Sequence, residues 1–255
     1  MKMIALVVST ASLLWPIVAS AQLNVLISGG FSGPYEQLLP DFERSSGIKV
    51  KTGSGASQGT GPQTIAAQLT RGVAVDVVIL SKEGLEELIA ARKIVTGTSV
   101  DLARVGLGVA VKTGTAKPDL STVDAFKQAL LGGRKIAIPG STSGIWLSTV
   151  LFPKLGLHII NVQITPRGTD ATALVASGGV DLAVLPVSEI VHATGVELAG
   201  SIAPEIQFIQ AFSAAIVAGS GENASAKRLI EHLTSVHAVN AIRKSGMEPA
   251  ASPAK

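Results

Sequence analysis

The sequence contains no cysteine. A chain without thiols forms no disulfide, offers no thiolate to a metal, and has no acceptor for the lipid that some exported proteins receive after their leader is cleaved. Its four histidines are dispersed, and no pair has the i, i+4 spacing that places two metal ligands on one helix face. We therefore predict no metal and no cofactor.

Aromatic residues make up only 4% of the chain, and charged residues only 15%. Bases stack on aromatic rings and phosphates bind clustered Lys and Arg, but here the 21 basic residues are scattered among 18 acidic ones. This composition excludes nucleic acid as a partner and leaves a mildly cationic surface.

Long apolar runs are also absent beyond the N-terminus. There, Lys2 precedes an apolar stretch at residues 3–18, and Ala19-Ser20-Ala21 is a small-x-small cleavage site. The stretch is shorter than the ~20 residues that span a bilayer. We expect residues 1–21 to be a signal peptide, and the mature chain to be a periplasmic monomer that does not insert into the membrane.

Strand-like apolar runs alternate with segments of helical period through the rest of the chain, which indicates an α/β protein with mainly parallel sheets. One helix is predicted after Pro34, where apolar residues recur at i, i+3, i+4 and i+7, and another is predicted to open at Ser121. The predicted strands are residues 23–27, 48–52, 75–80, 105–111, 135–139, 159–164 and 181–185, with a β-rich stretch at 206–218.

No Pro-rich or charged linker divides the chain. Strands that cross between two lobes fit this continuity better than separate domains joined by a linker. We predict one lobe from residues 22–104 plus 210–255, a second lobe from residues 105–209, and a ligand cleft between them.

Four Gly- and Ser-rich turns each follow a predicted strand and lead into a predicted helix. Backbone N–H groups and the positive end of a helix dipole bind anions in such turns, and ligands of open α/β sheets lie at the carboxyl ends of the strands. A single turn of this kind is more often an ordinary cap, but four of them, two in each half, favour an anion site. The turns are residues 28–33, 53–61, 140–144 and 167–170.

Two other kinds of site lack their motifs. The turn at residues 53–61 has no Gly-Lys-Ser/Thr ending to hold nucleotide phosphates, and no serine lies in a Gly-x-Ser-x-Gly elbow. The sequence therefore favours binding over covalent catalysis.

The order of these turns, together with the run Gln68-Leu69-Thr70-Arg71-Gly72-Val73-Ala74-Val75-Asp76-Val77, resembles the molybdate-binding solute receptors over essentially the whole mature chain. That resemblance implies a two-lobed type II periplasmic binding protein fold and an ABC permease as partner. Carried over turn by turn, it implies ligand-binding roles for Gly30, Phe31, Ser57, Ser141, Ser143, Gly144, Thr169, Asp170 and Ser188.

The sequence departs from the molybdate receptors after residue 185. Where those receptors usually carry a tyrosine, this chain has Pro186-Val187-Ser188-Glu189, and a carboxylate would repel an oxyanion. In this respect it looks more like an offshoot of the same family that includes periplasmic aconitate isomerase. In an isomerase Glu189 would be the catalytic base and then acid, with His192 and Lys135 as lesser candidates. Otherwise Glu189 is a solvated residue on the first turn of a helix.

Several functions stay open at this point. The chain is interpreted as a receptor that clamps a small anion, an organic di- or tricarboxylate, for an ABC transporter. The alternatives are an isomerase of cis- and trans-aconitate and a receptor for molybdate or tungstate. A ligand-sensing domain of a LysR-type regulator is disfavoured because no helix-turn-helix precedes the domain. Tyr35 and Trp146 could each contact the ligand, although packing explains them as well.

Overall fold

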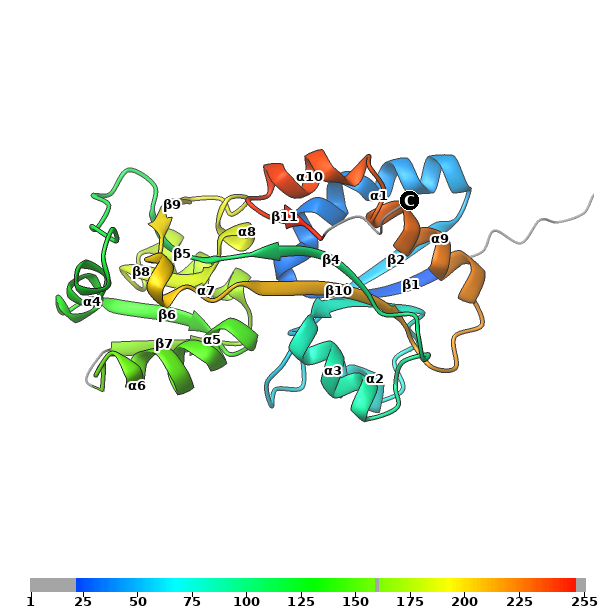
Figure 1. Ribbon diagram of the computed structural model, residues 1–255, viewed down its shortest axis with the longest axis horizontal. Helices are drawn as coiled ribbons and strands as arrows, with labels where there is room; N and C mark the ends of the chain where they lie inside the picture. Colours follow the sequence, from blue (N-terminus) through cyan, green and yellow to red (C-terminus); the bar gives the residue numbers. More distant parts are fainter. Residues whose placement is uncertain (1–21, 159–160, 251–255) are drawn as a thin grey trace, which may run out of the picture.

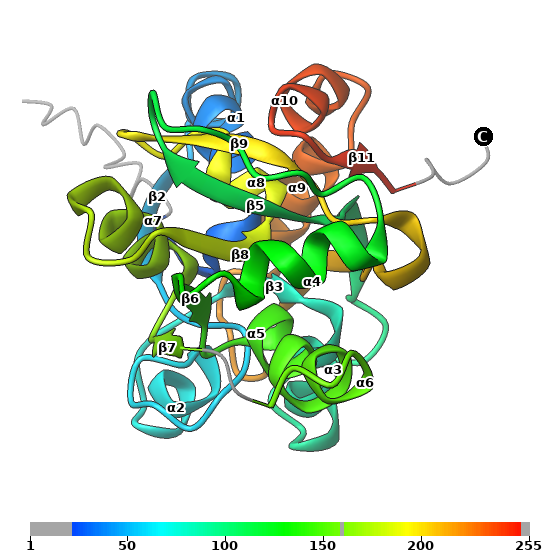
Figure 2. The same cartoon turned by 90° about the vertical axis from the view of Figure 1, so that its left-hand side faces the viewer.

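The computed structural model describes residues 22–158 and 161–250 and has two α/β lobes side by side along its long axis (Figure 1). Viewed along that axis, helices lie on both sides of the strands (Figure 2). The predicted signal peptide lies outside the described residues. The division into one lobe of residues 22–104 plus 210–255 and another of residues 105–209 stays a prediction.

Lobe 1 is the part of the chain built on a six-stranded sheet of order β11-β4-β10-β3-β1-β2. The pairs of β1 with β2 and with β3 are parallel, and the pairs made by β10 and β11 are antiparallel. The strands are β1 (Gln22–Ile27), β2 (Lys49–Ser54), β3 (Val77–Ser81), β4 (Val100–Val105), β10 (Gln210–Ile216) and β11 (Glu248–Pro249).

Helices cover both faces of this sheet because each of them has an apolar side. On one face α1 contacts α9 and α10, and on the other α3 contacts β3 and β10. Thr64 and Ser81 cap α2 and α3 by accepting hydrogen bonds from backbone N–H groups of the first turn. The helices are α1 (Ser32–Ser46), α2 (Ile65–Thr70), α3 (Lys82–Ala90), α9 (Asn223–Leu233) and α10 (Ala238–Lys244).

Lobe 2 is built on a five-stranded sheet of order β7-β6-β8-β5-β9, in which β6 pairs in parallel with β7 and β8 and β5 pairs antiparallel with β8 and β9. Its strands are β5 (Leu107–Lys112), β6 (Lys135–Pro139), β7 (Asn161–Thr165), β8 (Leu182–Pro186) and β9 (Val196–Ser201). Its helices are α4 (Val123–Leu131), α5 (Thr142–Trp146), a π-helical turn (Leu147–Leu151), α6 (Phe152–Lys154), α7 (Gly168–Ser177) and α8 (Val187–Ile190).

The chain passes between the lobes twice. It crosses first at Gly106, between β4 and β5, and returns through the segment between β9 and β10. The side chain of Gln207 joins the two crossings: its Oε1 accepts a hydrogen bond from Leu107 N at 2.7 Å, and its Nε2 donates to Leu107 O at 3.0 Å. Both backbone groups of Leu107 are therefore satisfied at the point where the chain changes lobe.

The structure corrects several local predictions. The expected strand at 105–111 is broken at Gly106, because β4 belongs to lobe 1 and β5 to lobe 2. Thr122, not Ser121, caps α4 by accepting from Ala125 N at 3.0 Å. Strand β9 was not predicted from the sequence. Both sheets are mixed, so the expected parallel pairing is found only around β1 and β6.

Asp76 fixes the start of β3 and gives a test of the packing. Its carboxylate accepts hydrogen bonds from Asn24 N at 2.8 Å and from Ser220 Oγ at 2.7 Å. Asp76→Ala leaves these donors without a partner in a buried place, so we expect the free energy of unfolding to fall by about 2–3 kcal/mol in urea denaturation. The exposed Asp124→Ala should change it by about 0.5 kcal/mol or less. An equal effect of the two substitutions would contradict this role of Asp76.

Candidate functional site

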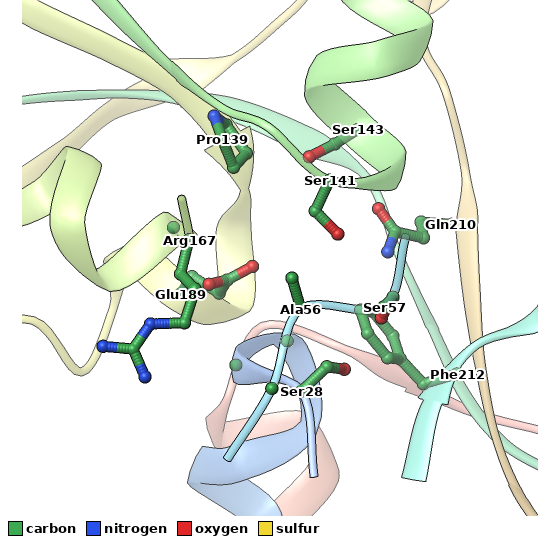
Figure 3. A pocket seen from close by; sticks show the side chains of 14 residues that line it. Ser28, Ala56, Ser57, Pro139, Ser141, Ser143, Arg167, Glu189, Gln210 and Phe212 are labelled. Carbon is green, nitrogen blue, oxygen red and sulfur yellow. The ribbon is translucent and has the colours of Figure 1, made fainter. Parts of the chain in front are cut away.

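A narrow cavity lies between the lobes, at the carboxyl ends of strands from both sheets (Figure 3). Its empty volume is about 330 Å³, including the open mouth. Lobe 1 contributes Ser28, Gly29, Gly30, Gly55, Ala56, Ser57, Gln210 and Phe212, and lobe 2 contributes Pro139, Ser141, Ser143, Arg167, Gly168 and Glu189.

Glu189 is the carboxyl group of this cavity. It lies on the short helix α8, directly after β8, and its side chain passes between Gly29 of lobe 1 and Gly168 of lobe 2. A Cβ atom at either glycine would collide with the Glu189 carboxylate. A side chain at either position would therefore displace the carboxyl from this place.

Burial raises the pKa of Glu189 to about 7, against an opposing attraction from Arg167. The carboxylate keeps some accessible surface because it faces the cavity, while protein atoms surround the rest of the side chain. Desolvation disfavours the charged form of an acid, which is the direction of this shift. A group with this pKa can both accept and donate a proton at neutral pH.

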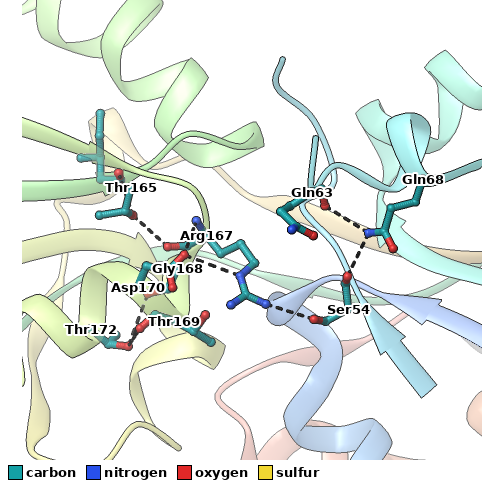
Figure 4. Close-up of polar contacts among 10 residues, drawn as sticks. Ser54, Gln63, Gln68, Thr165, Arg167, Gly168, Thr169, Asp170 and Thr172 are labelled. Carbon is teal, nitrogen blue, oxygen red and sulfur yellow. Dashed lines mark hydrogen bonds and ion pairs between the residues drawn. The ribbon is translucent and has the colours of Figure 1, made fainter. Parts of the chain in front are cut away.

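Arg167 lies beside Glu189 (Figure 3) and reaches from lobe 2 to Ser54 of lobe 1 (Figure 4). Its guanidinium donates a hydrogen bond to Ser54 Oγ at 3.0 Å and lies 3.6 Å from the Asp170 carboxylate. The Asp170 carboxylate also accepts from Arg167 N at 3.0 Å at the start of α7. Asp170 thus holds the backbone and the side chain of Arg167 in place.

Two serine hydroxyls in the cavity accept backbone hydrogen bonds and keep their own protons to donate. Ser57 Oγ accepts from Ser81 N at 2.9 Å, and Ser141 Oγ accepts from Gln58 N at 3.3 Å. Because a hydroxyl has one proton and two lone pairs, each can still donate to an anion in the cavity.

Other polar atoms of the site have no partner among the described residues. The Oγ of Ser28 and the Oε1 of Gln210 are buried without a hydrogen bond, and both side chains line the cavity. Buried polar groups in native proteins are nearly always paired with protein, water or ligand. The cavity therefore carries unused hydrogen-bonding capacity.

The structure brings together some of the residues predicted from the sequence. Gly30, Ser57, Ser141, Ser143 and Glu189 all line the cavity, on elements from both lobes.

The other predicted residues lie outside the lining. Phe31 belongs to the lobe 1 core, Gly144 packs tightly against Pro139, and Ser188 is buried without a partner. Thr169 lines the neighbouring groove beside Arg167, and Asp170 holds Arg167 as described above.

The remaining candidates have structural partners. Tyr35 is buried and shares a 2.7 Å hydrogen bond with Thr52, while Trp146 stacks on Phe208 at a ring distance of 5.0 Å. His192 bonds Ser245 Oγ at 2.8 Å. Lys135 is exposed at the start of β6, whereas the cavity lies at the end of that strand.

Sequence reasoning missed Ser28, Gly29, Arg167, Gly168 and Gln210. The first four lie in Gly-rich turns that were singled out, so the turns carried the signal although the individual residues were not chosen. Gln210 begins a strand and lies in no turn motif, so no local pattern pointed to it.

The family of bacterial extracellular solute-binding proteins matches residues 23–248. The chain belongs to this family. It is also 33% identical over 230 residues to an aconitate isomerase from Pseudomonas sp., an alignment that covers 89% of this chain and 87% of the relative. The resemblance inferred from the sequence is confirmed.

Solved structures of other proteins share the fold of this chain. The periplasmic molybdate-binding protein of Azotobacter vinelandii superposes with a TM-score of 0.67 at 24% identity, covering 88% of this chain and 98% of that one. The sulfate-binding protein of Mycobacterium tuberculosis gives a TM-score of 0.71 at 16% identity, covering 91% and 88%. These similarities confirm the predicted α/β fold.

Neither a metal site nor a membrane span is found in the described part of the chain. No group of three or more His, Asp or Glu side chains is placed to hold a metal ion there. Among the same residues, every helix is too short or too polar to cross a bilayer.

The position of Glu189 predicts how stability depends on pH. Its folded pKa of about 7 lies above the usual 4.5, so the contribution of the carboxyl to stability is present below pH 4.5 and is lost as the pH rises to 7. The loss is about 2–3 kcal/mol. As the pH rises from 4 to 8, we expect the free energy of unfolding of Glu189→Gln, measured by urea denaturation, to increase by this amount relative to that of the wild type. A difference that does not change with pH would contradict a buried carboxyl.

Proposed function

We propose that the chain is an exported isomerase that interconverts cis- and trans-aconitate by moving an allylic proton. The observation that carries this proposal is the half-buried Glu189 carboxyl, which has a pKa of about 7 and faces a cavity rich in hydrogen-bond donors. The 33% identity to an aconitate isomerase supports it. The Ala19-Ser20-Ala21 cleavage site supports a periplasmic location.

The site contains the parts that such a reaction needs. Ser57 and Ser141 can donate hydrogen bonds to substrate carboxylates, and Arg167 supplies positive charge. The ionised Glu189 takes a proton from the CH₂ group, and the electron pair spreads over the allylic carbons and their carboxyl groups. Glu189 then returns the proton to the other end of the allyl unit. The double bond has moved, and no proton is gained or lost overall.

A receptor for an organic di- or tricarboxylate is the second candidate. Family membership supports it, and a receptor would deliver its ligand to an ABC permease. A molybdate or tungstate receptor is less well supported, because an ionised Glu189 repels an oxyanion that carries no proton to share.

Turnover distinguishes the isomerase from the receptor. In deuterated water, proton NMR should follow interconversion of the aconitate isomers by the wild type, whereas a receptor leaves them unchanged. Glu189→Gln should abolish turnover but still bind aconitate, because it keeps the shape of the side chain and loses the base. Glu83→Gln is the matched control: Glu83 also has a pKa raised by burial but lies on α3, outside the cavity lining. Full activity of Glu189→Gln would mean that a residue other than Glu189 is the catalytic base.

The ligand class can be tested by calorimetry on refolded, ligand-free protein. We expect cis- or trans-aconitate to bind more tightly than molybdate, and Ser57→Ala and Ser143→Ala each to weaken aconitate binding about tenfold or more, since each removes a hydrogen bond to a charged group. Tight molybdate binding with no carboxylate binding would contradict the proposal. If neither serine variant changes the affinity, the ligand lies elsewhere.

A further inference from the structure

Gln210 is the neutral polar side chain that no motif in the sequence identified. It is the first residue of β10 and pairs with Val105, next to the point where the chain returns from lobe 2 to lobe 1. Its side chain reaches into the cavity near Ser141 and Ser143 (Figure 3). Gln210 is 4% exposed, and its Oε1 has no hydrogen-bond partner in the described part of the chain.

A buried amide oxygen without a donor is unfavourable, so a bound ligand should supply one. A carboxamide presents an N–H donor and a C=O acceptor side by side, and the opposite rotamer of the amide presents the same pair. An ionised carboxylate has only acceptors, so it places an oxygen against Oε1. A protonated carboxyl has one donor and one acceptor, and it therefore complements the whole amide.

The charges around the cavity favour the same form of the ligand. Arg167 is the one cationic side chain among the lining residues, and it already lies beside the Asp170 carboxylate. Glu189 adds an acidic group, and Glu36 lies in the neighbouring groove. A fully ionised tricarboxylate would bring three negative charges to one cation, and burying unpaired charge is costly.

We propose, resting on the isomerase function above, that the cavity binds its tricarboxylate with one carboxyl protonated, and that this neutral carboxyl pairs with the amide of Gln210. Neighbouring carboxylates raise one another's pKa, so the last proton of a triacid is retained easily. A neutral carboxyl conjugated to the allylic carbons accepts their electron pair better than an ionised one. Gln210 would thus favour the protonation state in which Glu189 can remove the C–H proton.

Proton uptake on binding tests this pairing. The probe is propane-1,2,3-tricarboxylate, which has no double bond and cannot isomerise. Calorimetry at pH 7 in two buffers of different ionisation enthalpy gives the number of protons taken up. The Glu189→Gln background removes the carboxyl of the cavity lining. In that background we expect uptake of roughly one proton per ligand.

Adding Gln210→Met to this background should abolish the uptake and weaken binding about tenfold, since Met keeps the shape but cannot hydrogen-bond. Gln163→Met is the matched control, because Gln163 is exposed on β7, outside the cavity lining. It should leave affinity and uptake unchanged.

Three results would overturn the proposal. Binding of the triacid without proton uptake while Gln210 is intact would refute the pairing of a protonated carboxyl with Gln210. The isomerase function would still stand if the enzyme interconverts the aconitate isomers. No binding of the triacid to the wild type refutes both the pairing and the tricarboxylate as the substrate class. An uptake unchanged in Gln210→Met assigns the proton to another group.

Discussion

The Glu189 carboxyl lies between Gly29 of lobe 1 and Gly168 of lobe 2, where a Cβ atom at either position would displace it. The group is desolvated by atoms of both lobes, so its pKa of about 7 depends on how the lobes pack. A solvent-exposed carboxyl would titrate near 4.5 and would be a weak base at neutral pH. The chemistry of the site therefore depends on the contact between the two lobes.

Polar contacts across the cavity hold that arrangement. Ser81 and Thr142 share a buried hydrogen bond of 2.7 Å between the lobes, and Arg167 reaches Ser54 at 3.0 Å. Gln207 holds the crossing segments at the other side of the junction. If the lobes move apart, Glu189 gains water, and its pKa falls toward the usual value. Separation of the lobes therefore favours release of the Glu189 proton.

The sequence predicted the fold well because the pattern of strands, helices and turns is local. The Gly- and Ser-rich turns also placed Ser57 and Ser141 at the carboxyl ends of strands, where the cavity lies, and the departure from the molybdate receptors after residue 185 pointed to Glu189. The sequence could not predict which turn residues point into the cavity, since that depends on how the lobes face each other. Gln210 was missed because it begins a strand and lies in no turn motif. The break of the strand at 105–111 was missed because one apolar run continues from one sheet into the other.

The central claim is that Glu189 titrates near neutral pH, and it can be measured directly. Carbon-13 NMR of protein labelled at the glutamate side-chain carboxyls, compared with the Glu189→Gln variant, isolates the signal of this residue. The account predicts a midpoint near pH 7 for that signal, in line with burial of the carboxyl. A midpoint near 4.5 would mean that water reaches the carboxyl freely, and it would contradict both the desolvated site and its role as a base at neutral pH.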